Sequence, residues 1–166
     1  METYRVSFFG HRKVENALQI EQDLEKIIAD LLYQHSYVEF LVGRDGEFDQ
    51  LVSSIIHRCK RNIRSDNSAH IWVLPYITAE YRENEQFYLD YYDEITVCDE
   101  ASMAHFKAAY QVRNRRMIDR SDFVIFCVQH EKGGAWQTMK YARRKGIPYL
   151  NLNDKLEINN EKFCNK

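Results

Sequence analysis

Near its start the chain reads YRVSFFGHR (Tyr4–Arg12), an apolar run that breaks into a glycine loop. Its aromatic and β-branched residues predict a buried strand over residues 4–9, and Gly10 lets the chain turn. The apolar residues that follow, up to Tyr33, recur at the spacing of an amphipathic helix. A strand, a glycine loop and a helix in this order make one unit of an α/β fold.

The same unit recurs along the chain. Further strands are predicted over residues 38–42, 70–74, 123–128 and 148–152, and helices are predicted from Phe48, from Ser102 as the N-cap, and after the glycine pair 133–134. This order predicts a Rossmann-like, doubly wound, mainly parallel sheet of about five strands flanked by helices. The tyrosine-rich stretch 76–97 has no clear hydrophobic period. Three roles stay open for it: a lid over a pocket, a subunit contact, or packing within the domain.

Length and composition fit a single domain. The 166 residues, 45% of them hydrophobic, predict one domain over residues 1–153 and a polar tail over 154–166. The start of the chain lacks the pattern of a signal peptide, and no apolar run reaches the length of a membrane span, so we expect a cytoplasmic protein without membrane contact. The four cysteines have no metal-ligand spacing and are interpreted as reduced thiols.

Charge gives a prediction about partners. The 23 basic and 25 acidic side chains nearly cancel, with a net charge of -2 and a pI near 6.3. No overall field then draws the chain to a polyanion, so the sequence predicts a small-molecule ligand and argues against nucleic acid as a partner.

Three glycine loops follow predicted strands and precede predicted helices, which places them where parallel sheets bind ligands. A single loop glycine usually serves only to turn the chain, but three such loops together favour a phosphate site. Arg113, near the end of a predicted helix, is interpreted as a phosphate clamp, helped by Asn114. The full set of predicted ligand-binding residues is Gly10, His11, Arg12, Gly43, Arg44, Gly46, Arg113, Asn114, Gly133 and Gly134.

Acidic residues beside the second loop are candidates for chemistry. Asp45, Glu47 and Asp49 could hold ribose hydroxyls or supply a general base, and His11 could act as an acid or simply as a hydrogen-bonding surface residue. The spacing of these carboxylates does not fit a calcium loop, and no metal constellation is visible. No required cofactor is evident, and Mg²⁺ is expected only if the phosphate of a ligand brings it.

Several short motifs resemble the SLOG superfamily, in the same order along residues 4–152. They are Ser7-Phe8-Phe9-Gly10-His11-Arg12, Gly43-x-x-Gly46-x-x-Asp49, Arg113-Asn114 with Ser121-Asp122, and Gly133-Gly134. The opening motif is most similar to the YpsA-like branch. The resemblance implies a Rossmann-like fold that binds nucleotides, nucleotide sugars or nucleotide-derived signals.

Two other branches of that superfamily imply different activities. The LOG-type phosphoribohydrolases place a glutamate where this chain has Lys140, so the resemblance does not supply their catalytic carboxylate. The DprA-like branch uses the fold with single-stranded DNA, against which the near-neutral charge argues. LOG-type proteins commonly form dimers, so a homo-oligomer is expected.

Three functions therefore stay open from the sequence. The first is a binding protein for a nucleotide or an ADP-ribose-like ligand, and the second is an N-glycosidase or another nucleotide hydrolase. The third is an interaction module that keeps the fold without the pocket.

Overall fold

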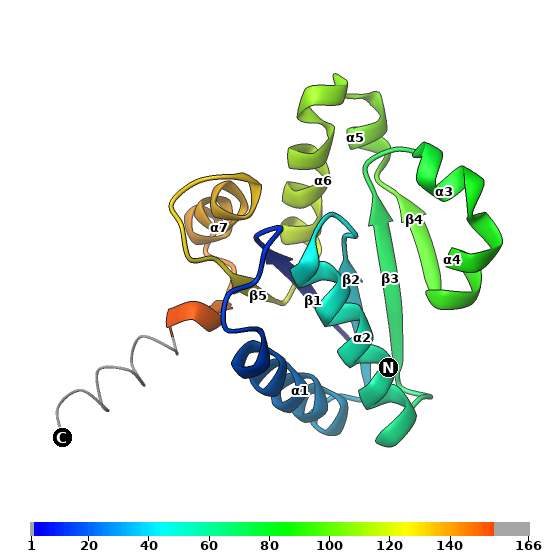
Figure 1. Ribbon diagram of the computed structural model, residues 1–166, viewed down its shortest axis with the longest axis vertical. Helices are drawn as coiled ribbons and strands as arrows, with labels where there is room; N and C mark the ends of the chain where they lie inside the picture. The colour runs from blue at the N-terminus through cyan, green and yellow to red at the C-terminus, as the bar shows by residue number, and fades with distance from the viewer. Residues whose placement is uncertain (1, 155–166) are drawn as a thin grey trace, which may run out of the picture.

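A parallel six-stranded sheet forms the centre of the molecule in the computed structural model, which describes residues 2–154 (Figure 1). All five neighbouring strand pairs are parallel, in the order β4-β3-β2-β1-β5-β6. The strands are β1 (Thr3–Gly10), β2 (Tyr37–Val42), β3 (Ser68–Leu74), β4 (Glu94–Val97), β5 (Phe123–Cys127) and β6 (Tyr149–Asn151). The order reverses beside β1, which is the switch point where α/β sheets bind ligands.

Helices connect the strands and cover both faces of the sheet (Figure 1). They are α1 (Ala17–Gln34), α2 (Glu47–Asn62), α3 (Ala79–Glu83), α4 (Glu85–Tyr91), α5 (Asp99–Met103), α6 (Phe106–Arg120) and α7 (Gly134–Lys145). The long helices α1 and α2 pack on one face, and α6 and α7 pack on the other. The two layers enclose two separate hydrophobic cores.

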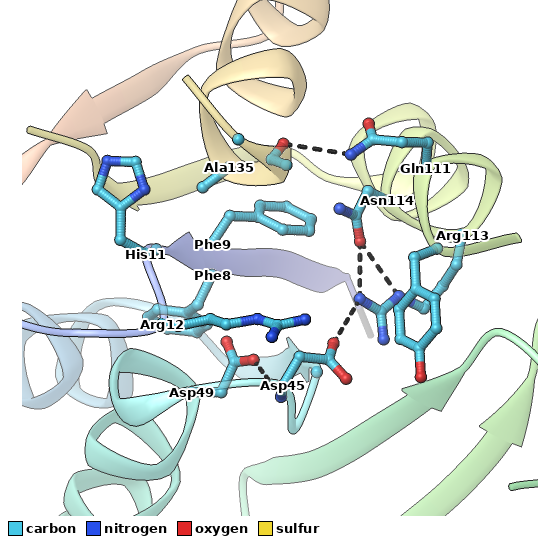
Figure 2. A pocket seen from close by; sticks show the side chains of 15 residues that line it. Phe8, Phe9, His11, Arg12, Asp45, Asp49, Gln111, Arg113, Asn114 and Ala135 are labelled. Atoms are coloured by element: carbon cyan, nitrogen blue, oxygen red, sulfur yellow. Dashed lines mark hydrogen bonds and ion pairs between the residues drawn. The ribbon is translucent and has the colours of Figure 1, made fainter. Parts of the chain in front are cut away.

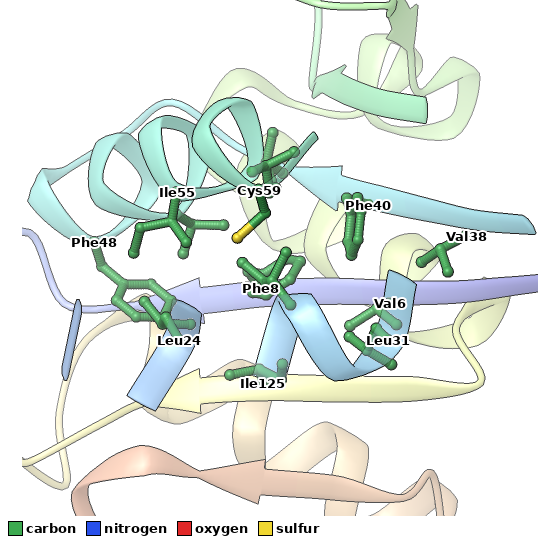
Figure 3. Packing of buried hydrophobic residues seen from close by; sticks show 14 of the residues in the cluster. Val6, Phe8, Leu24, Leu31, Val38, Phe40, Phe48, Ile55, Cys59 and Ile125 are labelled. Atoms are coloured by element: carbon green, nitrogen blue, oxygen red, sulfur yellow. The ribbon is translucent and has the colours of Figure 1, made fainter. Parts of the chain in front are cut away.

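Strand β1 contributes side chains to both cores because successive residues of a strand point to opposite faces. Val6 and Phe8 are fully buried in the core under α1 and α2, where Phe40 and Ile125 flank them on β2 and β5 (Figure 3). Phe9 lies in the other core, under α6 and α7. A strand buried on both faces explains the nearly continuous apolar run in the sequence.

The fold class predicted from the sequence is confirmed. All five predicted strands are present, and the sheet is entirely parallel among the residues described. The predicted N-cap at Ser102 is wrong, because Ser102 lies inside the short helix α5. Helix α6 begins only at Phe106, and its N-cap is His105, whose ring nitrogen accepts the backbone N–H of Lys107. The tail predicted from residue 154 lies outside the described residues, apart from Asp154 itself.

The tyrosine-rich stretch 76–97 forms α3, α4 and a sixth strand that the sequence analysis missed. Strand β4 extends the sheet beside β3, and the rings of Tyr88 and Tyr92 pack 4.9 and 5.2 Å from the ring of Trp72. Both tyrosines are more than nine-tenths buried. Much of the aromatic content here therefore serves to pack the added edge of the sheet.

The cysteines within the described range agree with the thiol interpretation. Cys59, Cys98 and Cys127 are buried and unpaired, whereas Cys164 lies outside that range. Over residues 2–154, no helix is long and apolar enough to cross a membrane.

Gly10 allows the end of β1 to pack directly against the start of α2. A Cβ atom at Gly10 would lie 2.4 Å from Cγ of Phe48, a side chain that is fully buried. Similarly, a Cβ at Gly46 would lie 2.6 Å from the Cα of Arg12. These two glycines bring the β1 loop and the β2–α2 loop into contact.

We expect Gly10→Ala to lower the free energy of unfolding by about 1–3 kcal/mol or more, because overpacking a rigid core displaces Phe48. Urea denaturation followed by circular dichroism measures the loss. Gly134→Ala is the matched control, since its Cβ would meet only the flexible Gln111 side chain, at 3.1 Å. Equal stability of the Gly10→Ala variant and the wild type would contradict the packing argument.

Candidate functional site

A pocket with a volume of about 300 Å³ lies at the carboxyl ends of the strands, beside β1 (Figure 2). All three predicted glycine loops contribute to it, together with one face of α6. Its lining residues are Phe8, Phe9, Gly10, His11, Arg12, Gly43, Asp45, Asp49, Tyr110, Gln111, Arg113, Asn114, Gly133, Gly134 and Ala135. The structure thus brings the three predicted loops together around one cavity.

Arg113 forms the centre of a hydrogen-bond network along one wall of this pocket. Its guanidinium donates to Oδ2 of Asp45 at 2.9 Å, to the carbonyl of Val73 at 3.3 Å and twice to Oδ1 of Asn114, at 2.8 and 3.1 Å (Figure 2). The residue is only 4% exposed. Its donors are directed at protein acceptors, so Arg113 holds the pocket wall together.

The network continues from Asn114 to the third loop. The Nδ2 of Asn114 donates to Oγ1 of Thr138 at 3.1 Å, and that hydroxyl donates to the carbonyl of Gly134 at 2.8 Å. Both side chains are buried. A single chain of hydrogen bonds therefore links the loop before α2 with the first turn of α7.

Gly43 leaves room for the ionic part of this network. A Cβ atom there would lie 3.1 Å from Oδ2 of Asp45, 3.2 Å from Oδ2 of Asp49 and 3.3 Å from Nη1 of Arg113. Any larger residue would push these charged groups apart. The glycine predicted as a ligand contact thus has a structural use of its own.

The first turn of α2 already carries negative charge. Glu47 and Asp49 both lie in it, and Oδ2 of Asp49 accepts the backbone N–H of Asp45 at 2.8 Å. Carboxylates at a helix N-terminus satisfy the positive end of its dipole. An anionic ligand would be repelled here, so α2 is a poor phosphate site.

The first turn of α7 offers the opposite environment. It contains no acidic residue, and its N-cap, Gly133, has no side chain to accept a hydrogen bond. Gly133 has a φ of 87°, a conformation that favours glycine, and a Cβ there would meet nothing within 4 Å. The first N–H groups of an uncapped helix are anion donors, and these lie at the rim of the pocket.

Arg12 brings a positive charge to the same space. Figure 2 shows its side chain extending into the pocket on the side of Asp45 and Asp49. Among the described residues, its guanidinium forms no hydrogen bond or ion pair. Arg12 can therefore offer its whole guanidinium to a ligand, whereas four of the five N–H donors of Arg113 already bond to protein acceptors.

His11 connects the first loop with the third. Its Nε2 accepts the backbone N–H of His130 at 3.1 Å, and the two imidazole rings stack 5.6 Å apart. Burial and the neighbouring His130 lower the pKa of His11. A neutral ring that accepts at Nε2 positions the loop, whereas the alternative role as an acid would need a proton on that nitrogen.

Three predicted residues do not line the pocket: Arg44, Gly46 and Glu47. Arg44 points to α3 and α4, where it donates to the hydroxyl of Tyr92 at 3.2 Å and lies 4.9 Å from the ring centre of Tyr88. Glu47 accepts the backbone N–H of Val14 at 2.8 Å. The stretch 76–97 does not line the pocket, but its Tyr76 ring lies 6.0 Å from the ring of Tyr110, which does, so the lid hypothesis stays a prediction.

Asp49 is the carboxylate with the most perturbed acidity in the pocket. Its pKa is raised from 3.8 to about 6, chiefly by burial and also by the neighbouring Asp45 carboxylate, whereas the Asp45 N–H and Arg113 act in the opposite direction. The side chain is partly exposed to the pocket, although protein surrounds it. A carboxylate that titrates near neutral pH can exchange protons with a ligand.

Sequence analysis missed two aromatic and polar contributors on α6. Tyr110 and Gln111 line the pocket directly before Arg113, and the ring of Tyr110 lies 5.2 Å from that guanidinium. Helical spacing from Arg113 was the signal that could have identified them. Over residues 2–154, no cluster of three or more His, Cys, Asp or Glu side chains could hold a metal ion.

No family model matches the chain, and the curated proteins contain no significant match. Solved structures do resemble it. DNA processing protein A (DprA) from Streptococcus pneumoniae superposes with a TM-score of 0.63 at 18% identity, over 88% of this chain and 49% of that one. The present chain thus spans about half the length of that protein.

A second similar structure is DNA processing protein A from Helicobacter pylori, described for its single-stranded DNA binding mode. It has a TM-score of 0.61 at 14% identity and covers 95% of this chain and 73% of that one. These likenesses confirm the Rossmann-like fold. Assignment to the YpsA-like branch stays a prediction.

The argument against nucleic acid is overturned by this second neighbour, since the same fold there binds single-stranded DNA. That argument relied on the net charge of the whole chain. Net charge says nothing about how charge is distributed, and a single face of a near-neutral protein can be strongly basic.

We expect Asp49 to titrate near pH 6 in the folded protein, which carboxyl ¹³C chemical shifts measure. Asp45→Asn should lower this midpoint, because it removes a like charge. Since the folded-state pKa lies above the ordinary value, the stability contributed by protonated Asp49 is complete below about pH 4 and is lost as the pH rises to about 6. A midpoint unaffected by Asp45→Asn would contradict the coupling of the two carboxylates.

Proposed function

We propose that the pocket binds a phosphate-bearing nucleotide unit, either free or as part of a single strand of nucleic acid. The observation that carries this proposal is the uncapped, non-acidic first turn of α7, with the guanidinium of Arg12, which has no partner within residues 2–154, in the same pocket. Backbone N–H groups at a helix start and an arginine fork together form a common phosphate site.

The rest of the pocket fits the other parts of a nucleotide. Phe9 and Tyr110 offer aromatic surface to a base, and Asp45 and Asp49 offer carboxylate oxygens to ribose hydroxyls. A volume of about 300 Å³ is at the lower end of the range for small-molecule sites. One nucleotide unit therefore suits the pocket better than a larger ligand.

The structural neighbour from Helicobacter pylori supports including nucleic acid among the ligands. A single strand presents the same phosphate, sugar and base as a free nucleotide. The proposed contacts at α7, Arg12 and Tyr110 serve both.

We expect AMP, ADP, ADP-ribose or dTMP to raise the melting temperature, since a ligand at 100 times its Kd stabilises the fold by about 2.7 kcal/mol. Arg12→Ala should weaken binding by about 10- to 100-fold, the usual cost of a lost charge-assisted hydrogen bond. Isothermal titration calorimetry measures this loss.

Lys13→Ala is the control, because Lys13 is an exposed neighbour that does not line the pocket. Equal weakening in both variants would point to a general loss of positive charge. If neither nucleotides nor an oligonucleotide stabilises the protein, the proposal fails and the interaction module gains support.

A second candidate function is nucleotide hydrolysis with Asp49 as the general base, favoured by its pKa of about 6. Lys140, at the position of the LOG-type glutamate, is exposed on α7, and its amine lies 5.6 Å from the ring centre of Trp136. It does not line the pocket, so any catalytic carboxylate must come from the second loop.

If the protein is a hydrolase, we expect Asp49→Asn to abolish turnover and to keep most of the binding, because the amide oxygen still accepts a ribose hydroxyl but cannot act as a base. Chromatography of nucleotide mixtures after incubation detects the products. An absence of products with the wild type, despite measurable binding, would eliminate the hydrolase and leave the binding function.

A further inference from the structure

Helices α6 and α7 concentrate the basic residues of this chain. Together they carry nine of the 23 Lys and Arg residues but only one of the 25 Asp and Glu residues. The two helices pack against each other in the layer that covers one face of the sheet (Figure 1). The net charge of -2 is therefore the sum of a strongly basic pair of helices and an acidic rest of the chain.

Four exposed cations on this layer define what we call the basic face: Arg115, Lys140, Arg144 and Lys145. Three of them surround the ring of Tyr141, with Arg115 at 5.4 Å, Arg144 at 5.5 Å and Lys145 at 5.6 Å from its centre. Within the described part of the chain, none of the four forms an ion pair or a side-chain hydrogen bond.

The acidic group nearest to this cluster is already engaged. Asp119 accepts the hydroxyl of Tyr141 at 2.7 Å, and its other oxygen pairs with Arg116 at 3.4 Å. Several like charges that share one aromatic ring repel each other unless anions screen them. The basic face is thus suited to a ligand that carries several negative charges.

The basic face is continuous with the pocket. Gln111 lines the pocket and donates to the carbonyl of Gly134 at 3.4 Å, and Arg115 lies one helical turn further along α6. The four residues from Gln111 to Arg115 rise about 6 Å along the helix axis. A chain that leaves the pocket past Gln111 would reach Arg115 next.

We propose that the basic face binds the phosphate backbone of a single strand of nucleic acid that continues from the pocket. This inference rests on the proposed function and extends it from one nucleotide unit to a polymer. A duplex fits poorly, because a base that enters the pocket must be unpaired. An anionic membrane is less suitable too, because none of the large exposed hydrophobic side chains within residues 2–154 belongs to α7 or to α6 beyond Phe106.

The test compares two triple variants of the full chain. Arg115→Gln/Arg144→Gln/Lys145→Gln removes three charges from the basic face, and Lys26→Gln/Arg61→Gln/Arg82→Gln removes three exposed charges from α1, α2 and α3. Fluorescence anisotropy with a labelled oligothymidylate of about 20 nucleotides measures affinity over a salt titration, and calorimetry with dTMP measures occupancy of the pocket.

We expect the basic-face variant to bind the oligonucleotide at least about tenfold more weakly at low salt. Its slope of log affinity against log salt should be shallower by about 2, since each single-strand phosphate contact contributes about 0.7. Its affinity for dTMP should equal that of the wild type. The control variant should keep most of its affinity for both probes.

Unchanged oligonucleotide affinity and salt slope in the basic-face variant would overturn the inference, as would equal losses in the control variant. Loss of binding to phosphatidylserine vesicles with full retention of oligonucleotide binding would reassign the face to a membrane. Failure of the proposed function looks different: dTMP does not bind and Arg12→Ala has no effect, while the basic-face variant still weakens oligonucleotide binding.

Discussion

The ion pair between Arg113 and Asp45 is the contact on which the site depends. A buried guanidinium is costly unless its donors are satisfied, and here α6 supplies the arginine while the ends of β2 and β3 supply acceptors. Asn114 and Thr138 then carry the same network to the start of α7. Loops far apart in the sequence are thereby held at fixed distances around one cavity.

The sequence predicted the fold well because the hydrophobic periodicity and the glycines at the strand ends were both strong signals. Buried parallel strands such as β1 and β5 are nearly continuous apolar runs, and the glycine loops after β1 and β2 mark the strand ends at the pocket. Strand β4 was missed because Glu94–Val97 is short and mostly half-exposed, so neither its length nor its alternation stands out. Its existence depends on tertiary packing of tyrosines against Trp72.

The structure gathers most of the predicted site residues around one cavity, but it also gives several of them structural contacts that the sequence did not predict. The loop glycines lie at or after the end of a strand and before a helix, as the sequence predicted for Gly10, Gly43 and Gly46. Only the structure shows that they allow close packing or leave space for charged side chains. Arg113 and Arg12 are equivalent in a sequence, and only the structure shows that Arg113 is buried with most of its donors bonded to protein while Arg12 is exposed. The net charge failed to predict the partner for a similar reason. It sums the charge over the whole surface, whereas a ligand contacts only one face.

The interlocked glycines give the pocket two walls of unequal stiffness. On one side, the β1 loop and the start of α2 are in direct backbone and ring contact through Gly10 and Gly46, so neither can move alone. On the other side, Gly133 has open space around it and no capping side chain to restrain it. Adaptation to ligands of different size would thus be confined to the turn at Gly133, because the first turn of α7 is already tied to the Arg113 network, while the Arg12 side serves as a fixed reference surface.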